Sequence, residues 1–191
     1  DAESNVNLLQ PDAQMISGFP WTAETGIWKS TAYGDINNDD IADLVIADRD
    51  GSVYALDNTG ALIFSSSVEA QNLLTPMISD IDGDGQMDII TFDLDNKLSA
   101  FDNNGDMLSN FPVELPNTLF CDMASADINE DGKNDILIST LDGNLYVYGF
   151  DGENIAGFPI ALSAISATSP IVLDNKKIVI GTVDNKLYIF G

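Results

Sequence analysis

The chain has 191 residues, of which 45% are hydrophobic, so it is long enough to bury one sizeable core. Its 31 acidic and 7 basic residues give a net charge of −24, which repels nucleic acid and anionic membrane surfaces. No stretch approaches the ~20 apolar residues of a membrane span, so membrane insertion is not expected. Because this much negative charge also destabilises a compact state through self-repulsion, the composition favours bound divalent ions that neutralise part of it.

The sequence repeats with a period of roughly 46 residues. Loops that start with aspartate recur at Asp35, Asp80 and Asp127, and a degenerate fourth copy starts at Asp174. A phenylalanine stands 16 residues before each loop, and proline follows it in every copy but the second: Phe19, Phe64, Phe111 and Phe158. We therefore expect a single domain over residues 1–191, with repeats at approximately 22–67, 68–114, 115–161, and 162–191 together with 12–21.

Each repeat contains four short segments that are rich in β-branched and aromatic residues and are separated by turn residues. In the first repeat these segments cover residues 31–34, 44–47, 53–56 and 61–65. Four-stranded units that recur every ~40 to 50 residues, without helical periodicity, are typical of propellers. The sequence therefore predicts an all-β fold, a β-propeller of four four-stranded blades.

The two ends of the chain suggest how the ring closes. The fourth repeat stops at Gly191, directly after its third strand, and residues 12–20 align with the outer-strand sequence 151–159. We expect the N-terminal strand to complete the last blade, because this leaves no sheet edge unpaired at the seam. The strand can come from the same chain, giving a monomer, or from a second chain, giving a strand-swapped dimer. The alternative is that the sequence is a fragment of a larger propeller.

The three intact loops share the pattern Asp-x-[Asp/Asn]-x-Asp-x-x-x-Asp. Calcium takes six to eight oxygens, and such a loop offers side-chain oxygens at positions 1, 3, 5 and 9 and a backbone carbonyl at position 7. The predicted metal ligands are Asp35, Asn37, Asp39, Ile41 and Asp43 in the first loop, Asp80, Asp82, Asp84, Gln86 and Asp88 in the second, and Asp127, Asn129, Asp131, Lys133 and Asp135 in the third.

Several features refine this prediction of three Ca²⁺ sites. Position 6 needs a sharp turn, which suits Gly85 and Gly132 and is tolerable for Asp40. Position 12 falls inside a strand, so these are not EF-hand loops, and magnesium seldom uses such all-protein cages. The second loop has four carboxylates and should bind calcium most tightly. In the shortened fourth copy Lys177 replaces the last ligand, so we expect no calcium there.

These loops, within blades whose outer strand carries Phe-Pro, resemble the FG-GAP or VCBS repeats of integrin α-subunit propellers and of bacterial surface and secreted proteins. The resemblance extends from about Asp12 to Gly191. It implies a calcium-binding propeller in which calcium is mainly structural, with a protein or glycan as the ligand. It does not identify that ligand.

The residue inventory argues against catalysis. Histidine is absent, which removes the commonest general base and the imidazole-dependent triads. The single cysteine, Cys121, has no basic partner in the sequence and is expected to be an inert thiol. We therefore expect no enzymatic activity, no catalytic residues and no organic cofactor.

The most suggestive ligand surface is formed by Trp28 and Phe120, which occupy the same position in two repeats, seven residues before the leading aspartate. Aromatic side chains at a propeller mouth can bind a sugar or a peptide, although plugging the narrow centre of the ring or the gaps between blades is the more common role for such residues. The expected function is a calcium-binding interaction or scaffold domain, secreted or at the cell surface. The alternative is a lectin-like propeller or a carbohydrate-targeting appendage of a secreted enzyme.

Overall fold

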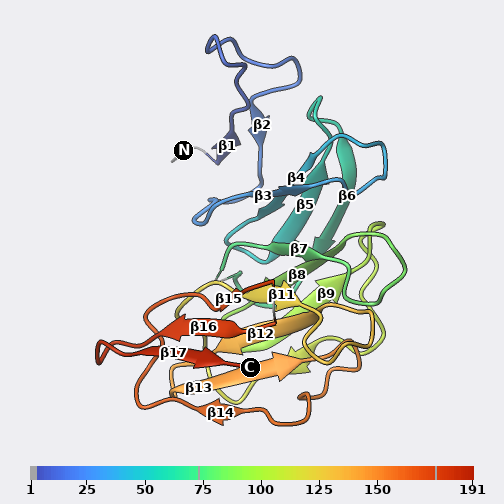
Figure 1. Ribbon diagram of the computed structural model, residues 1–191. Coiled ribbons are helices and arrows are strands. Elements are labelled where there is room, and N and C mark those ends of the chain that lie inside the picture. The colour runs from blue at the N-terminus through green and yellow to red at the C-terminus, as the bar shows by residue number, and fades with distance from the viewer. Residues whose placement is uncertain (1–3, 73, 175) are drawn as a thin grey trace. The chain divides into compact units, whose positions relative to one another are not determined.

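The computed structural model describes residues 4–72, 74–174 and 176–191, and every regular element in these ranges is a β-strand (Figure 1). Within them no helix is long and apolar enough to cross a membrane. The predicted all-β class is therefore confirmed. Strands of five residues with alternating or continuous apolar side chains, such as Asp43–Ala47 and Asp135–Ser139, follow from the β-branched content of the sequence.

The strands form consecutive antiparallel sheets that match the repeats. The first blade has the order β3-β4-β5-β6: Ala32–Gly34, Asp43–Ala47, Ser52–Leu56 and Leu62–Ser67. The second has β7-β8-β9-β10: Met77–Ser79, Asp88–Phe92, Lys97–Phe101 and Val113–Glu114. The third has β11-β12-β13-β14: Ala124–Ala126, Asp135–Ser139, Asn144–Tyr148 and Ile160–Ala161. The fourth has three strands, β15-β16-β17: Ile171–Val172, Ile178–Gly181 and Leu187–Phe190.

The chain divides into two compact units. The first comprises residues 1–78, 86–95 and 99–108, and the second comprises residues 79–85, 96–98 and 109–191. The first unit thus holds the first blade and the N-terminal segment, and the second holds the third and fourth blades. Residues of the second blade belong to both units.

A separate hairpin lies at the N-terminus, where β1 (Asn5–Val6) pairs with β2 (Trp21–Thr22). Its register, Val6 opposite Trp21, is that of the third and fourth strands of a blade, since Leu145 lies opposite Ile160 in the same way. The β2 strand is therefore an outer strand, as expected, but its neighbour is β1.

The predicted closure of the ring by the N-terminal strand is wrong for this structure. The backbone edge of β2 is already paired with β1, which takes the third-strand position that the prediction gave to β17. Among the described residues the fourth blade has three strands, and β2 is not one of them. The alternative expectation, a fragment of a larger propeller, is consistent with this three-stranded blade.

The core of each unit lies between adjacent sheets. In the second unit one face of the third blade packs against the fourth blade through Leu137, Leu145, Val147, Ile178 and Ile180. In the first unit the first blade has a cluster on each face: one joins it to Ile89 and Phe101 of the second blade, and the other joins it to Phe19 and Ala23. The first sheet is thus packed on both faces, which is why its central strands β4 and β5 read as nearly continuous hydrophobic runs.

The outer strands explain the exception in the Phe-Pro motif. In three repeats proline removes a backbone donor, and the outer strand pairs over two residues only, as in β10 and β14. Phe64 is followed by Ser65 instead, and β6 pairs with β5 from Ser52 opposite Ser67 to Leu56 opposite Leu62. The three Phe-Pro peptide bonds are cis.

Candidate metal sites

The three intact loops occupy the same place in their blades, between the first and second strands. The leading residues Asp35, Asp80 and Asp127 directly follow β3, β7 and β11, and the ninth residues Asp43, Asp88 and Asp135 begin β4, β8 and β12. The ninth residues are buried, with 1%, 2% and 1% of their surface exposed. Each loop therefore runs from the surface to a carboxylate at the edge of the core.

The backbone of all three loops turns through the left-handed region twice. Position 6 has positive φ, as predicted, at Asp40 (64°), Gly85 (86°) and Gly132 (88°). Position 4 also has positive φ, at Asn38 (60°), Gly83 (77°) and Glu130 (63°), which the sequence did not indicate. Two left-handed residues per loop curl the chain tightly and bring alternate side chains to one side.

The leading aspartate holds this curl through hydrogen bonds from the loop backbone. In the first loop the amides of Asp39 and Asp40 donate to Asp35 at 3.1 and 2.9 Å. The amides of positions 5 and 6 donate to Asp127 in the third loop at 3.2 Å each, and Gly83 and Gly85 donate to Asp80 in the second loop at 2.7 and 3.0 Å.

The ninth aspartate anchors the start of the loop. The amides of Ile36 and Asn37 donate to Oδ2 of Asp43 at 2.9 and 3.3 Å, and those of Ile128 and Asn129 donate in the same way to Asp135 at 2.8 and 3.3 Å. Burial raises the pKa of both carboxyls, although these amide bonds act in the opposite direction. A nearby cation would favour the ionised form.

One oxygen of the first site is left over. Oδ1 of Asp43 is buried and has no hydrogen-bond partner. A buried carboxylate oxygen without a partner is costly, and a metal ion at the centre of the loop would satisfy it. The donor set of this loop therefore fits calcium.

The second loop has the most compact group of carboxylates. One oxygen each from Asp80, Asp82 and Asp88 lies within 4.8 Å of the others. Two ligands on opposite sides of a calcium ion, at the usual ~2.4 Å, are separated by about this distance. Asp84 is exposed at the rim of the loop. The spacing fits one calcium ion, and this is the loop predicted to bind it most tightly.

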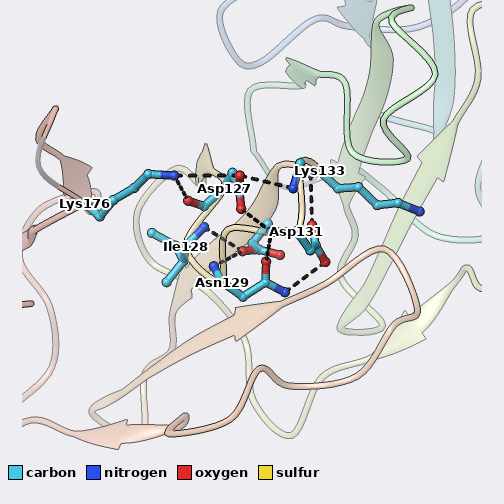
Figure 2. Close-up of polar contacts among 8 residues, drawn as sticks. Asp127, Ile128, Asn129, Asp131, Lys133 and Lys176 are labelled. Carbon is cyan, nitrogen blue, oxygen red and sulfur yellow. Dashed lines mark hydrogen bonds and ion pairs between the residues drawn. The ribbon is translucent and has the colours of Figure 1, made fainter.

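In the third loop the side chains bond to one another (Figure 2). Nδ2 of Asn129 donates to Asp131 at 2.9 Å, and the amides of Asp131 and Lys133 donate to Asn129 and Asp131. The Lys133 side chain runs away from Asp127, and its ammonium lies 4.6 Å from the ring centre of Phe150. A second lysine, Lys176, points into the loop from the fourth repeat.

The structure places the remaining predicted residues as follows. Ile41 is exposed, Lys133 packs on Phe150 as described, and the Gln86 side chain accepts hydrogen bonds from Asn38 and Asn103. All of these contacts involve side chains, and the metal-binding role of the backbone carbonyls at position 7 stays a prediction. In the fourth repeat, the contact to the third loop comes from Lys176, the neighbour of Lys177.

Trp28 and Phe120 are both exposed, each at 67% of its surface. The guanidinium of Arg49 lies 4.6 Å from the ring centre of Trp28, and Tyr33 of the same unit is also exposed. Both aromatic side chains therefore lie at the surface of their units. A cavity of about 430 Å³ lies beside the third loop, lined among others by Lys133, Phe150 and Glu153.

Cys121 is partly exposed, and burial, followed by the charge of Asp122, raises the pKa of its thiol. A raised pKa lowers the thiolate fraction, which is the reactive form.

Repeated antiparallel sheets, which pack face to face within each of the two units, define the class of the fold as a β-propeller. Solved propellers share it: BBS1N in complex with ARL6DN (TM-score 0.73, 14% identity, 100% of this chain and 59% of that chain) and BamB from Moraxella catarrhalis (TM-score 0.65, 19% identity, 100% and 63%). The WD40 β-propeller domain of Doa1 is also similar (TM-score 0.67, 18% identity, 100% and 58%). This chain thus spans about three fifths of the length of each.

The sequence itself identifies the repeat. Residues 80–138, which contain the second and third loops, match the FG-GAP-like repeat family. The predicted resemblance to FG-GAP repeats is therefore confirmed over these residues, and the fold is that of a β-propeller. No curated protein sequence gives a significant match to the chain.

Proposed function

We propose that this domain is a calcium-stabilised interaction module. The observation that carries the proposal is the recurrence of one loop geometry at three equivalent places, with a buried ninth aspartate and two left-handed residues each time. Acidic surface turns without a common ligand would not be expected to share this geometry at equivalent positions. Bound calcium would link the first and second strands of the first three blades and neutralise clustered carboxylates.

The residues that would hold the ions are the predicted loop ligands, led by Asp43 with its unpartnered oxygen and by the group of Asp80, Asp82 and Asp88. Extracellular calcium modules commonly bind at ~10⁻⁴ to 10⁻³ M, so such sites fill outside a cell and stay empty in a cytosol. On this ground we propose a secreted or cell-surface location.

The proposed partner is a protein. Trp28 and Arg49 form an exposed aromatic and cationic pair on an otherwise acidic chain, Tyr33 of the first blade is exposed too, and residues of these types are enriched in protein interfaces. One structurally similar propeller, BBS1N, is described in complex with ARL6DN. The absence of histidine from the sequence supports a binding role and not a catalytic one.

A lectin-like function is the second candidate, favoured by the exposed Trp28 ring, which offers a flat face to a sugar. Glycan arrays with the whole chain discriminate between the two. Sugar binding that disappears in Trp28→Ala, at an unchanged melting temperature, would favour the lectin.

The calcium proposal is tested by thermal unfolding in excess chelator and across a calcium titration, with bound ions counted by native mass spectrometry. Ligand at ten times its dissociation constant stabilises by about 1.4 kcal/mol per site. Three sites should therefore raise Tm by roughly 10 °C in a domain of this size, and magnesium should do much less.

The matched control replaces the exposed fifth residues of the loops together: Asp39→Asn, Asp84→Asn and Asp131→Asn. This variant should fold in chelator and lose most of the calcium response. No bound calcium and no shift in the unaltered protein would reject the proposal.

A further inference from the structure

Lys176, in the shortened loop of the fourth repeat, reaches the leading ligand of the third loop (Figure 2). Its ammonium donates a hydrogen bond to the backbone oxygen of Asp127 and lies 3.8 Å from the carboxylate oxygen Oδ2. The two side chains are 42% and 25% exposed. The contact therefore joins two repeats that are 49 residues apart in sequence.

The second and third loops show the equivalent contact one repeat earlier in the chain. There the backbone amide of Asn134, at position 8 of the third loop, donates to the backbone oxygen of Asp80, the leading residue of the second loop, at 3.3 Å. Counting back from the equivalent strand residues Ile136 and Ile178, Lys176 corresponds to Asn134. The same position thus contacts the same carbonyl of the preceding loop in both cases.

The donor, however, has changed. The fourth loop lacks about five residues, and in it the lysine side chain replaces the backbone amide. A backbone amide is neutral, whereas an ammonium adds a full positive charge beside the third loop. At the second loop the donor to the leading residue is this neutral amide, and the nearby Lys133 side chain packs by its methylene groups against Gly83.

A fixed positive charge within a few ångströms of a ligand carboxylate repels an incoming divalent ion. It also offsets part of the mutual repulsion among Asp127, Asp131 and Asp135 when no ion is bound. Since Lys176 is partly exposed, solvent screens both effects, and a change of about 3- to 30-fold in affinity is expected rather than complete loss.

We propose that Lys176 is a tethered cation that lowers the calcium affinity of the third loop and stabilises that loop when it is calcium-free. The inference rests on the proposed calcium function, and it makes the third site an affinity-tuned one. The second site fills first, and the third fills only at higher calcium. Asn129 in place of an aspartate already weakens the third site, and Lys176 lowers its calcium affinity further.

The test uses the position 6 glycines as separate reporters in one sample. The amides of Gly85 and Gly132 each donate to the leading aspartate of their own loop, so their ¹H–¹⁵N signals report calcium binding at the second and third sites. In Lys176→Gln the dissociation constant reported by Gly132 should fall by about 3- to 30-fold, while that of Gly85 changes less than about twofold.

Two further variants separate charge from structure. Lys177→Gln removes the same charge one residue away and should leave the Gly132 value nearly unchanged. Lys176→Arg keeps the charge and a donor and should preserve the weak third site. In chelator, Lys176→Gln should lower Tm, and saturating calcium should reduce that difference.

An unchanged or higher Gly132 dissociation constant in Lys176→Gln overturns the inference, as does an equal decrease in Lys177→Gln. If neither glycine responds to calcium in the unaltered protein, the calcium function itself fails and the inference falls with it. If Gly85 responds normally while the lysine variants do not differ, only the role of Lys176 is rejected.

Discussion

Asp43 is both a hydrogen-bond acceptor for the loop backbone and a candidate metal ligand. One oxygen accepts hydrogen bonds from the amides of Ile36 and Asn37, and the other is buried without a partner. Asp43→Ala should therefore lower the free energy of unfolding in chelator by about 1–3 kcal/mol, because two amides lose their acceptor. It should also abolish calcium binding at the first loop.

Asp39→Ala is the matched control, since Asp39 is exposed and belongs to the same loop. It should remove calcium binding at that loop and change the stability in chelator by less than about 1 kcal/mol. Urea unfolding of both variants, with and without calcium, measures the two effects. Equal losses in chelator would show that the ninth residue has no greater structural role than the fifth.

The loop spacing is readable from sequence because each ligand position carries a particular residue type. The left-handed turn at position 6 follows from Gly85 and Gly132. The turn at position 4 does not, because Glu130 adopts it without any local preference. The contact between Lys176 and Asp127 could not be predicted from the sequence either, because it depends on packing between repeats.

At the scale of the element, the third strands of the last two blades make a natural comparison. Leu145 and Leu187 occupy equivalent positions in β13 and β17, yet Leu145 is fully buried against Ile178 and Ile180 while Leu187 is 67% exposed. Leu145→Ala should cost about 2–5 kcal/mol. Leu187→Ala should cost less than about 1 kcal/mol.

Denaturant unfolding of the two variants, compared with the unaltered chain, checks this difference. Similar losses for both would mean that the outer face of the fourth blade is covered in solution. The repeat pattern predicted that both leucines lie on strands, but burial depends on whether another sheet faces them. The β1–β2 pairing was missed for a related reason: strands of two residues carry too little periodicity to be recognised.

At the scale of the whole molecule, the net charge of −24 makes stability depend on what screens it. Salt shortens the Debye length from about 30 Å at 0.01 M to about 3 Å at 1 M, so it should relieve repulsion among the loop carboxylates. Three bound calcium ions would change the net charge from −24 to −18, and they act where carboxylates are most crowded.

Calcium and sodium chloride should therefore substitute for each other in part. In chelator, Tm should rise clearly between 0.01 and 0.5 M sodium chloride, because the Debye length shortens over this range. In saturating calcium the same salt series should give a smaller rise, because the local repulsion has already been removed. A rise of the same size in both series would show that the repulsion relieved by salt lies outside the loops. The net charge would then affect stability independently of the metal sites.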